Sequence, residues 1–148
     1  MSIALLDVNV LIGLLDPAHV THEEAHAWFS RHRRQGWATS PVTLNRCVRI
    51  LSNPAYLSVE ATPAQVVSHL RRFCEAKDHH FWQDSLAITD PRVFVPEMIG
   101  GHAKITDACL LALAVRNGGR LATFDRSIPI KAVVGARPEN VELLGARA

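Results

Sequence analysis

Two short apolar runs, each leading to an aspartate, constrain the fold of this chain more than any other feature. The run IALL leads directly into Asp7, and the run LATF leads directly into Asp125. Short continuous apolar runs are typical of strands that are buried on both faces of a parallel sheet. An ionised carboxylate is costly to bury unless a cation or hydrogen-bond donors accompany it. Asp7 in particular therefore needs partners elsewhere in the chain.

Helical patterns alternate with these apolar runs along the sequence. Strands are predicted at residues 3–6, 37–40, 79–84, 120–124 and 140–144. Helices are predicted at residues 10–15, 21–34, 41–51, 62–77 and 105–115, and two of them begin with a cap residue followed by proline. This alternation predicts an α/β fold with a central parallel sheet covered by helices on both faces. The chain contains no internal repeat or long linker, so we expect a single domain over residues 1–148.

Composition limits the classes of protein to be considered. A hydrophobic fraction of 48% and a charged fraction of 20% are those of an ordinary globular protein. The net charge of +2 gives no general polycation, although most of the 16 basic residues are arginines, which suit phosphate. Cys47, Cys74 and Cys109 are odd in number and far apart, which indicates buried free thiols. With no signal peptide and no membrane span in the sequence, we expect a cytoplasmic protein.

Three aspartates are expected to meet at one edge of the sheet. Asp7 and Asp125 follow predicted strands, and Asp107 lies in the first turn of the predicted helix at 105–115. Ligands bind at the carboxyl ends of parallel strands, where loops and helix N-termini gather. Uncompensated carboxylates would repel each other by about 4 kcal/mol per pair at 4 Å and a dielectric constant of 20. A Mg²⁺ or Mn²⁺ ion, which prefers oxygen ligands, would remove that repulsion.

Each of these residues also has a simpler interpretation. Asp107 alone would be a helix cap, and Asp125 alone a turn residue. The segment HEEAH, from His22 to His26, matches a zinc-peptidase motif, but its context is poor because only 21 residues precede it. The pair His79-His80 is typical of a strand edge.

Taken together, the motifs resemble the PIN-domain family, and within it the VapC ribonuclease toxins. The resemblance rests on LLDVNVLIGLLD, TSPVTLNRCVRILSNPAY and KITDACLLALAVRNGGRLATFDRSI, in that order and at that spacing. It implies a three-layer α/β/α fold, an endoribonuclease that depends on Mg²⁺ or Mn²⁺, a homodimer, and a small antitoxin that blocks the site. Asp7, Asp107 and Asp125 stand at the acidic positions of the family, and Asn9 at its nearby polar one. The RNA target, tRNA or ribosomal RNA, stays open.

The sequence departs from the family at one acidic position. Where the family commonly has Glu followed by Asn, this chain has Leu44 and Asn45, and no acid occurs between Glu24 and Glu60. Three interpretations follow: the three aspartates suffice, Asn45 supplies a neutral ligand, or the chain is an impaired PIN module that binds RNA or a protein. We favour retained activity, with Leu44 as a candidate cause of weaker cleavage.

Three arginines are candidates for phosphate contact near this edge: Arg46, Arg49 and Arg126. A solvated helix face is the alternative interpretation of the first two.

Overall fold

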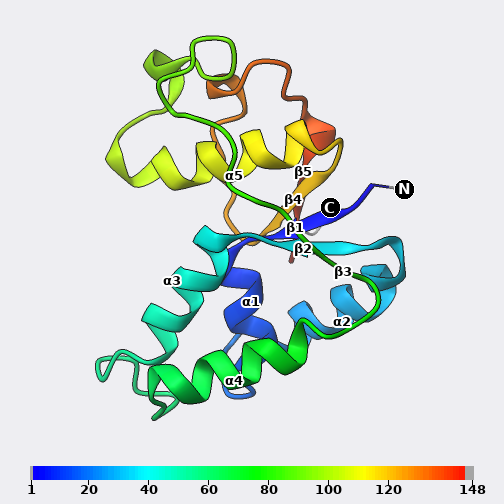
Figure 1. Ribbon diagram of the computed structural model, residues 1–148, viewed down its shortest axis with the longest axis vertical. Helices are drawn as coiled ribbons and strands as arrows, with labels where there is room; N and C mark the ends of the chain where they lie inside the picture. Colours follow the sequence, from blue (N-terminus) through cyan, green and yellow to red (C-terminus); the bar gives the residue numbers. More distant parts are fainter. Residues whose placement is uncertain (1, 146–148) are drawn as a thin grey trace.

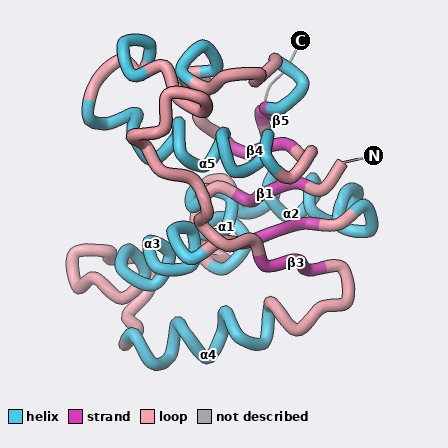
Figure 2. Tube along the Cα trace, turned by 45° about the horizontal axis from the view of Figure 1, so that its top comes forward, coloured by secondary structure: helices cyan, strands magenta, loops and turns pink. Residues whose placement is uncertain are grey.

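A five-stranded parallel sheet forms the centre of the molecule. The computed structural model describes residues 2–145, so the two ends of the predicted domain, residue 1 and residues 146–148, lie outside the described residues. The strands are β1 (Ala4–Leu6), β2 (Trp37–Thr39), β3 (His79–Phe81), β4 (Arg120–Thr123) and β5 (Val141–Leu143). Their order across the sheet is β3-β2-β1-β4-β5, and every neighbouring pair is parallel (Figure 2).

Helices cover both faces of this sheet. One face carries α1 (Val8–Leu15), α2 (His22–His32), α3 (Pro41–Leu51) and α4 (Pro63–Phe73), and the other carries α5 (Ile105–Arg116) (Figure 1). Short 3₁₀ turns lie in the connections on both sides of α5. The three-layer α/β/α fold and the parallel sheet predicted from the sequence are confirmed.

Alternation along the strands divides the buried side chains between two cores. Ala4 and Leu6 of β1 join the core under α1 to α4, whereas Leu5 joins the core under α5. Strand β4 shows the same alternation, with Ala122 in the first core and Leu121 in the second. This period-two pattern is what a strand buried on both faces requires.

Most predicted helix ends agree with the structure to within one residue, and three do not. Helix α2 ends at His32 rather than residue 34, because the chain tightens there into a 3₁₀ turn over Arg33–Gln35. Helices α3 and α4 begin with capping boxes at Ser40 and Thr62, as the cap-then-proline pattern predicts. Helix α1 begins at Val8 rather than residue 10, because the side chain of Asp7 caps it. Helix α4 ends at Phe73 rather than residue 77, because the chain must turn there to enter β3 beside β2.

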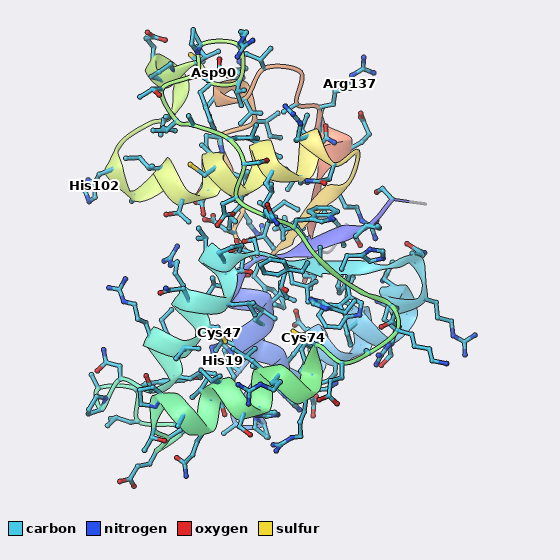
Figure 3. The ribbon with its side chains drawn as sticks, in the orientation of Figure 1. His19, Cys47, Cys74, Asp90, His102 and Arg137 are labelled. Atoms are coloured by element: carbon cyan, nitrogen blue, oxygen red, sulfur yellow. The ribbon has the colours of Figure 1, made fainter. Side chains whose placement is uncertain are left out.

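The cysteines are free, but they are not equally buried. Cys47 is fully buried, whereas Cys74 and Cys109 are half-buried, so the prediction of buried thiols is correct only for the first. Cys47 and Cys74 both lie on the face of the sheet that carries α3 and α4 (Figure 3). Within residues 2–145, we find no helix that is long and apolar enough to cross a membrane.

Candidate active site

The three predicted aspartates come from separate elements that meet at the carboxyl edge of the sheet. Asp7 follows β1, Asp125 lies two residues beyond the end of β4, and Asp107 lies in the first turn of α5. The parallel pairing of β1 with β4 places the first two at the same end of neighbouring strands. Their charges act on one another, since both Asp7 and Asp125 raise the pKa of Asp107. The structure therefore brings the three carboxylates into one cluster.

Asp7 is buried and fully engaged by donors. One carboxylate oxygen accepts a hydrogen bond from the backbone N–H of Val8 at 2.7 Å, and the other accepts one from the hydroxyl of Thr123 at 2.7 Å. Burial raises the pKa of this carboxyl, while the two hydrogen bonds and the positive charge of Arg46 oppose the rise. Asp7 thus has a structural role as the N-cap of α1 besides any role in the site.

Among the three aspartates, Asp107 has the most strongly shifted pKa. Burial, followed by the charges of Asp7 and Asp125, raises its pKa to about 6. A carboxyl group held among other carboxyls resists ionisation unless a cation compensates it. Strongly perturbed carboxyls of this kind gather at functional sites.

Asp125 sits in a tight turn that holds its carboxylate in the charged form. One carboxylate oxygen accepts hydrogen bonds from the side-chain hydroxyl of Ser127 at 2.7 Å and from its backbone N–H at 2.8 Å. These two bonds, together with the nearby ammonium of Lys104, lower the pKa of Asp125. The turn interpretation of this residue is therefore correct, and it is compatible with a place in the cluster.

A buried threonine, which the sequence did not single out, joins the two strand ends. The hydroxyl of Thr123 donates to Asp7 and accepts from the side-chain amide of Asn9 at 3.3 Å and from the backbone N–H of Asp125 at 3.0 Å. The amide oxygen of Asn9 accepts from the backbone N–H of Phe124 at 3.2 Å. Asn9 thus fixes the loop that carries Asp125. This contact depends on the pairing of β1 with β4, which the sequence alone does not give.

Lys104 was also missed, and among residues 2–145 its ammonium is the cationic group that forms ion pairs with the cluster. Its ammonium lies 3.5 Å from a carboxylate oxygen of Asp125 and 3.8 Å from one of Asp107, and it donates to the hydroxyl of Ser127. In the sequence, a lone lysine before a helix looks like an ordinary exposed charge.

The predicted arginines lie around the cluster without hydrogen bonding to it. Arg46 is exposed on α3, and its charge acts on Asp7. With Asn45, it lines a hollow of about 250 Å³ at the start of α3. Arg49 and Arg126 are exposed. Among residues 2–145, no hydrogen bond or ion pair joins Asn45 or any of these arginines to the three aspartates, so their roles stay predictions.

Leu44, at the position where an acid was expected, packs as an apolar side chain. It is half-buried against the core under α3 and α4. It also lines an almost wholly apolar groove of about 350 Å³ between these helices, together with Val48, Val67 and Leu70. Asn45, the next residue, lines both this groove and the hollow beside Arg46.

Three of the histidines that the sequence singled out have structural partners. An imidazole nitrogen of His22 lies 2.7 Å from the carbonyl of Gly13, and one of His26 lies 3.2 Å from the carbonyl of Leu14, so both rings satisfy the end of α1. His79 pairs with the hydroxyl of Thr39 at 2.7 Å. These contacts leave the zinc-peptidase interpretation of HEEAH without support.

The donor chemistry of the cluster fits a hard divalent cation. Three carboxylates and the neighbouring amide and hydroxyl oxygens are the ligands that Mg²⁺ and Mn²⁺ prefer. In the described part of the chain, however, no three His, Cys, Asp or Glu side chains are already arranged around one metal position. The carboxylates are instead held by Thr123, Ser127 and Lys104. Side chains must therefore shift before the aspartates can share an ion.

Comparisons with known proteins agree with this arrangement. Residues 4–133 match the model of the PIN domain. The chain is 42% identical to ribonuclease VapC44 of Mycobacterium tuberculosis over 141 residues, which covers 95% of this chain and 99% of the relative. It is 41% identical to ribonuclease VapC39 of the same species over 132 residues, covering 89% and 95%.

A solved structure gives the same fold. The crystal structure of VapBC2 from Rickettsia felis, bound to a DNA fragment from their promoter, matches with a TM-score of 0.61 at 14% identity, covering 96% of this chain and 98% of that one. A likeness at this identity supports the fold. The matches over most of the sequence go further: the chain belongs to the PIN domain family, among its VapC-type members.

Proposed function

We propose that this protein is a metal-dependent endoribonuclease that acts as the toxin of a toxin–antitoxin pair. The observation that carries the proposal is the meeting of Asp7, Asp107 and Asp125 at one edge of the sheet, where the first and third raise the pKa of the second. Relatives that cover nearly the whole chain are named as ribonucleases. This function also explains why carboxylates are gathered where their mutual repulsion destabilises the fold.

Each residue of the cluster has a distinct task in this proposal. Asp7, Asp107 and Asp125 would hold a Mg²⁺ or Mn²⁺ ion, which supplies positive charge for the phosphodiester and favours deprotonation of an attacking water. Thr123 and Asn9 position the carboxylates of Asp7 and Asp125 through the hydrogen bonds described above.

RNA would approach along the side of the cluster that carries α3. Arg46 lines the hollow at the start of α3, its charge acts on Asp7, and it would bind a phosphate of the substrate. Arg49, one helical turn further on, and Arg126, directly after Asp125, would extend this contact. We expect tRNA or ribosomal RNA as the substrate.

Cleavage by matched variants tests the proposal. Purified total tRNA and ribosomal RNA are incubated with the protein and Mn²⁺ or Mg²⁺, beside an EDTA control. Discrete products should appear with wild type, disappear with EDTA, and disappear with Asp107→Asn. Asp107 is the best target because Asp7 also caps α1, so that its loss would alter folding. Asp90→Asn, in an exposed turn away from the cluster (Figure 3), should cleave like wild type. Equal cleavage by both variants would contradict the proposal.

The alternative function is a PIN module that binds RNA or a protein without cleaving. It is favoured by Leu44, which packs in the groove between α3 and α4 where an acid was expected. Mn²⁺ binding by wild type together with no cleavage of either RNA would support this alternative.

We also propose two protein partners. A homodimer is expected from the family, and light scattering coupled to size-exclusion chromatography tests it. An antitoxin is expected as well, and the structural relative from Rickettsia felis carries the name VapBC. If the chain is such a toxin, its expression should arrest bacterial growth and expression of Asp107→Asn should not.

A further inference from the structure

Lys104 occupies the position between two of the three carboxylates. Its ammonium lies 3.5 Å from Asp125 and 3.8 Å from Asp107, and it also donates to the hydroxyl of Ser127. All three charged side chains are largely shielded, with exposed fractions of 26% for Lys104, 14% for Asp107 and 30% for Asp125. The ammonium is therefore directed into the cluster rather than toward solvent.

The backbone that carries Lys104 is fixed by its place in the fold. Lys104 ends a 3₁₀ turn (His102–Lys104) that runs directly into α5, and its N–H donates to the carbonyl of Gly101 at 3.1 Å. Gly101 has a φ of 121°, a conformation that favours glycine. Since Asp107 lies three residues further on, the turn places the two side chains on the same side of the helix start.

Neither helix capping nor the helix dipole explains a lysine at this position. A positive charge at the N-terminus of a helix opposes the helix dipole. Lys104 is the N-cap of α5 and makes no side-chain hydrogen bond to its first turn. What it gains instead is contact with two carboxylates, one of them close to Asp7 and carrying a raised pKa.

We propose that Lys104 is a built-in counter-cation that neutralises Asp107 and Asp125 in the metal-free protein and competes with the divalent ion for them. This inference rests on the proposed function, because it assigns the carboxylates to an ion. A Mg²⁺ or Mn²⁺ ion that uses both carboxylates must displace the ammonium. Lys104 therefore lowers the affinity of the site for the ion and reduces carboxylate repulsion when no ion is bound.

The affinity for Mn²⁺, measured by titration calorimetry, is the first test. Lys104→Met removes the charge and keeps the length of the side chain, and we expect it to bind Mn²⁺ about tenfold more tightly, which corresponds to about 1.4 kcal/mol. Lys104→Arg keeps the charge and should stay near wild type. Lys77→Met removes an exposed ammonium that precedes β3, at the opposite edge of the sheet, and should bind Mn²⁺ like wild type.

Thermal unfolding in EDTA is the second test and needs no metal-loaded protein. Lys104→Met should unfold at a lower temperature than wild type in EDTA, because its carboxylates repel each other. Added Mn²⁺ should raise its unfolding temperature by more than that of wild type.

The outcomes separate this inference from the proposed function. Unchanged or weaker Mn²⁺ binding by Lys104→Met would overturn the competing role, and an unchanged unfolding temperature in EDTA would overturn the neutralising role. Either result rejects the inference and leaves the metal site of wild type intact. If neither wild type nor Lys104→Met binds Mn²⁺, the metal requirement of the proposed function fails as well.

Discussion

Asp7 shows how one buried carboxylate serves both the fold and the site. It caps α1 through Val8 and accepts the hydroxyl of Thr123, so its burial has a structural explanation that the sequence alone did not reveal. These bonds also fix the orientation of its oxygens. Asp7 is thereby held at the edge of the sheet where the other two aspartates lie, whereas its neighbours must shift before the three can share an ion.

Loss of the Thr123 hydroxyl should destabilise the protein by about 2 kcal/mol, since a buried acceptor left without its donor costs 1–3 kcal/mol. The variant is Thr123→Val, which keeps the shape of this fully buried side chain. Urea unfolding measures the effect. Thr89→Val, at an exposed position, is the control and should change the free energy of unfolding by less than about 0.5 kcal/mol. Equal free energies of unfolding for Thr123→Val and wild type would show that the hydrogen bond to Asp7 does not contribute to stability.

Arg46 should contribute one phosphate contact to RNA binding. Arg46→Gln is expected to weaken binding and to reduce the slope of log affinity against log salt by about 0.7, the value for one phosphate of a single strand. Fluorescence anisotropy in EDTA measures binding without cleavage. Arg31→Gln, on an exposed face of α2, should leave the slope unchanged. The same slope in both variants would contradict the assignment of Arg46.

The site was only partly predictable at the level of single residues. Asp7 and Asp125 could be found because each follows an apolar run, and Asp107 because it opens a helix. Thr123 and Lys104 could not. A threonine in a strand fits any β pattern, and its bonds to Asp7 and Asp125 depend on which strands are neighbours. The contact of Lys104 with Asp125 likewise joins loops that are distant in sequence.

At the level of elements, the turn between α4 and β3 is held by an ion pair. The guanidinium of Arg33 donates to both oxygens of Asp78 at 2.9 and 3.2 Å, and the indole N–H of Trp37 donates to one of them at 2.8 Å. This cluster fastens the start of β3 to the start of β2. It accounts for the early end of α4, because residue 78 must reach the sheet.

Asp78→Asn should destabilise the protein by about 1.5 kcal/mol near neutral pH, the value for a hydrogen bond to a charged group. The bond to Arg33 lowers the pKa of Asp78 below its ordinary value of 3.8. The contribution is therefore present above pH 3.8 and is lost as the pH falls through the lower pKa of the folded state. Urea unfolding at several pH values should show the gap between variant and wild type closing in acid. Glu75→Gln, an exposed neighbour, should show no such gap.

At the level of the whole molecule, the parallel arrangement of the strands was predictable from the sequence, and their order across the sheet was not. Continuous apolar runs separated by helices are enough to indicate a parallel sheet. The position of β1 in the middle depends on which crossover covers which face, and no local pattern records that choice. The placement of α1 to α4 on one face and α5 on the other follows from the same choice (Figure 1).

A buried arginine ties together chain segments that are far apart in sequence. Arg120, at the start of β4, donates to the carbonyl and hydroxyl of Ser2, to the side-chain oxygen of Gln35 and to the carboxylate of Glu142 in β5. Glu142 also accepts from the indole N–H of Trp28. Arg120 is only 7% exposed, so its buried positive charge needs compensation, and the carboxylate of Glu142 supplies it.

Glu142→Gln should therefore lower the global stability by about 2 kcal/mol, because a buried charge loses its partner while a neutral acceptor stays in place. Urea unfolding should show a lower midpoint with an unchanged slope, since the same surface is exposed on unfolding. Arg120 lies at the amino end of β4 and the aspartates lie at the carboxyl edge, so the Mn²⁺ affinity of the folded protein should not change. Glu139→Gln, an exposed neighbour, is the control. A change in Mn²⁺ affinity for Glu142→Gln alone would show that the two edges of the sheet are coupled.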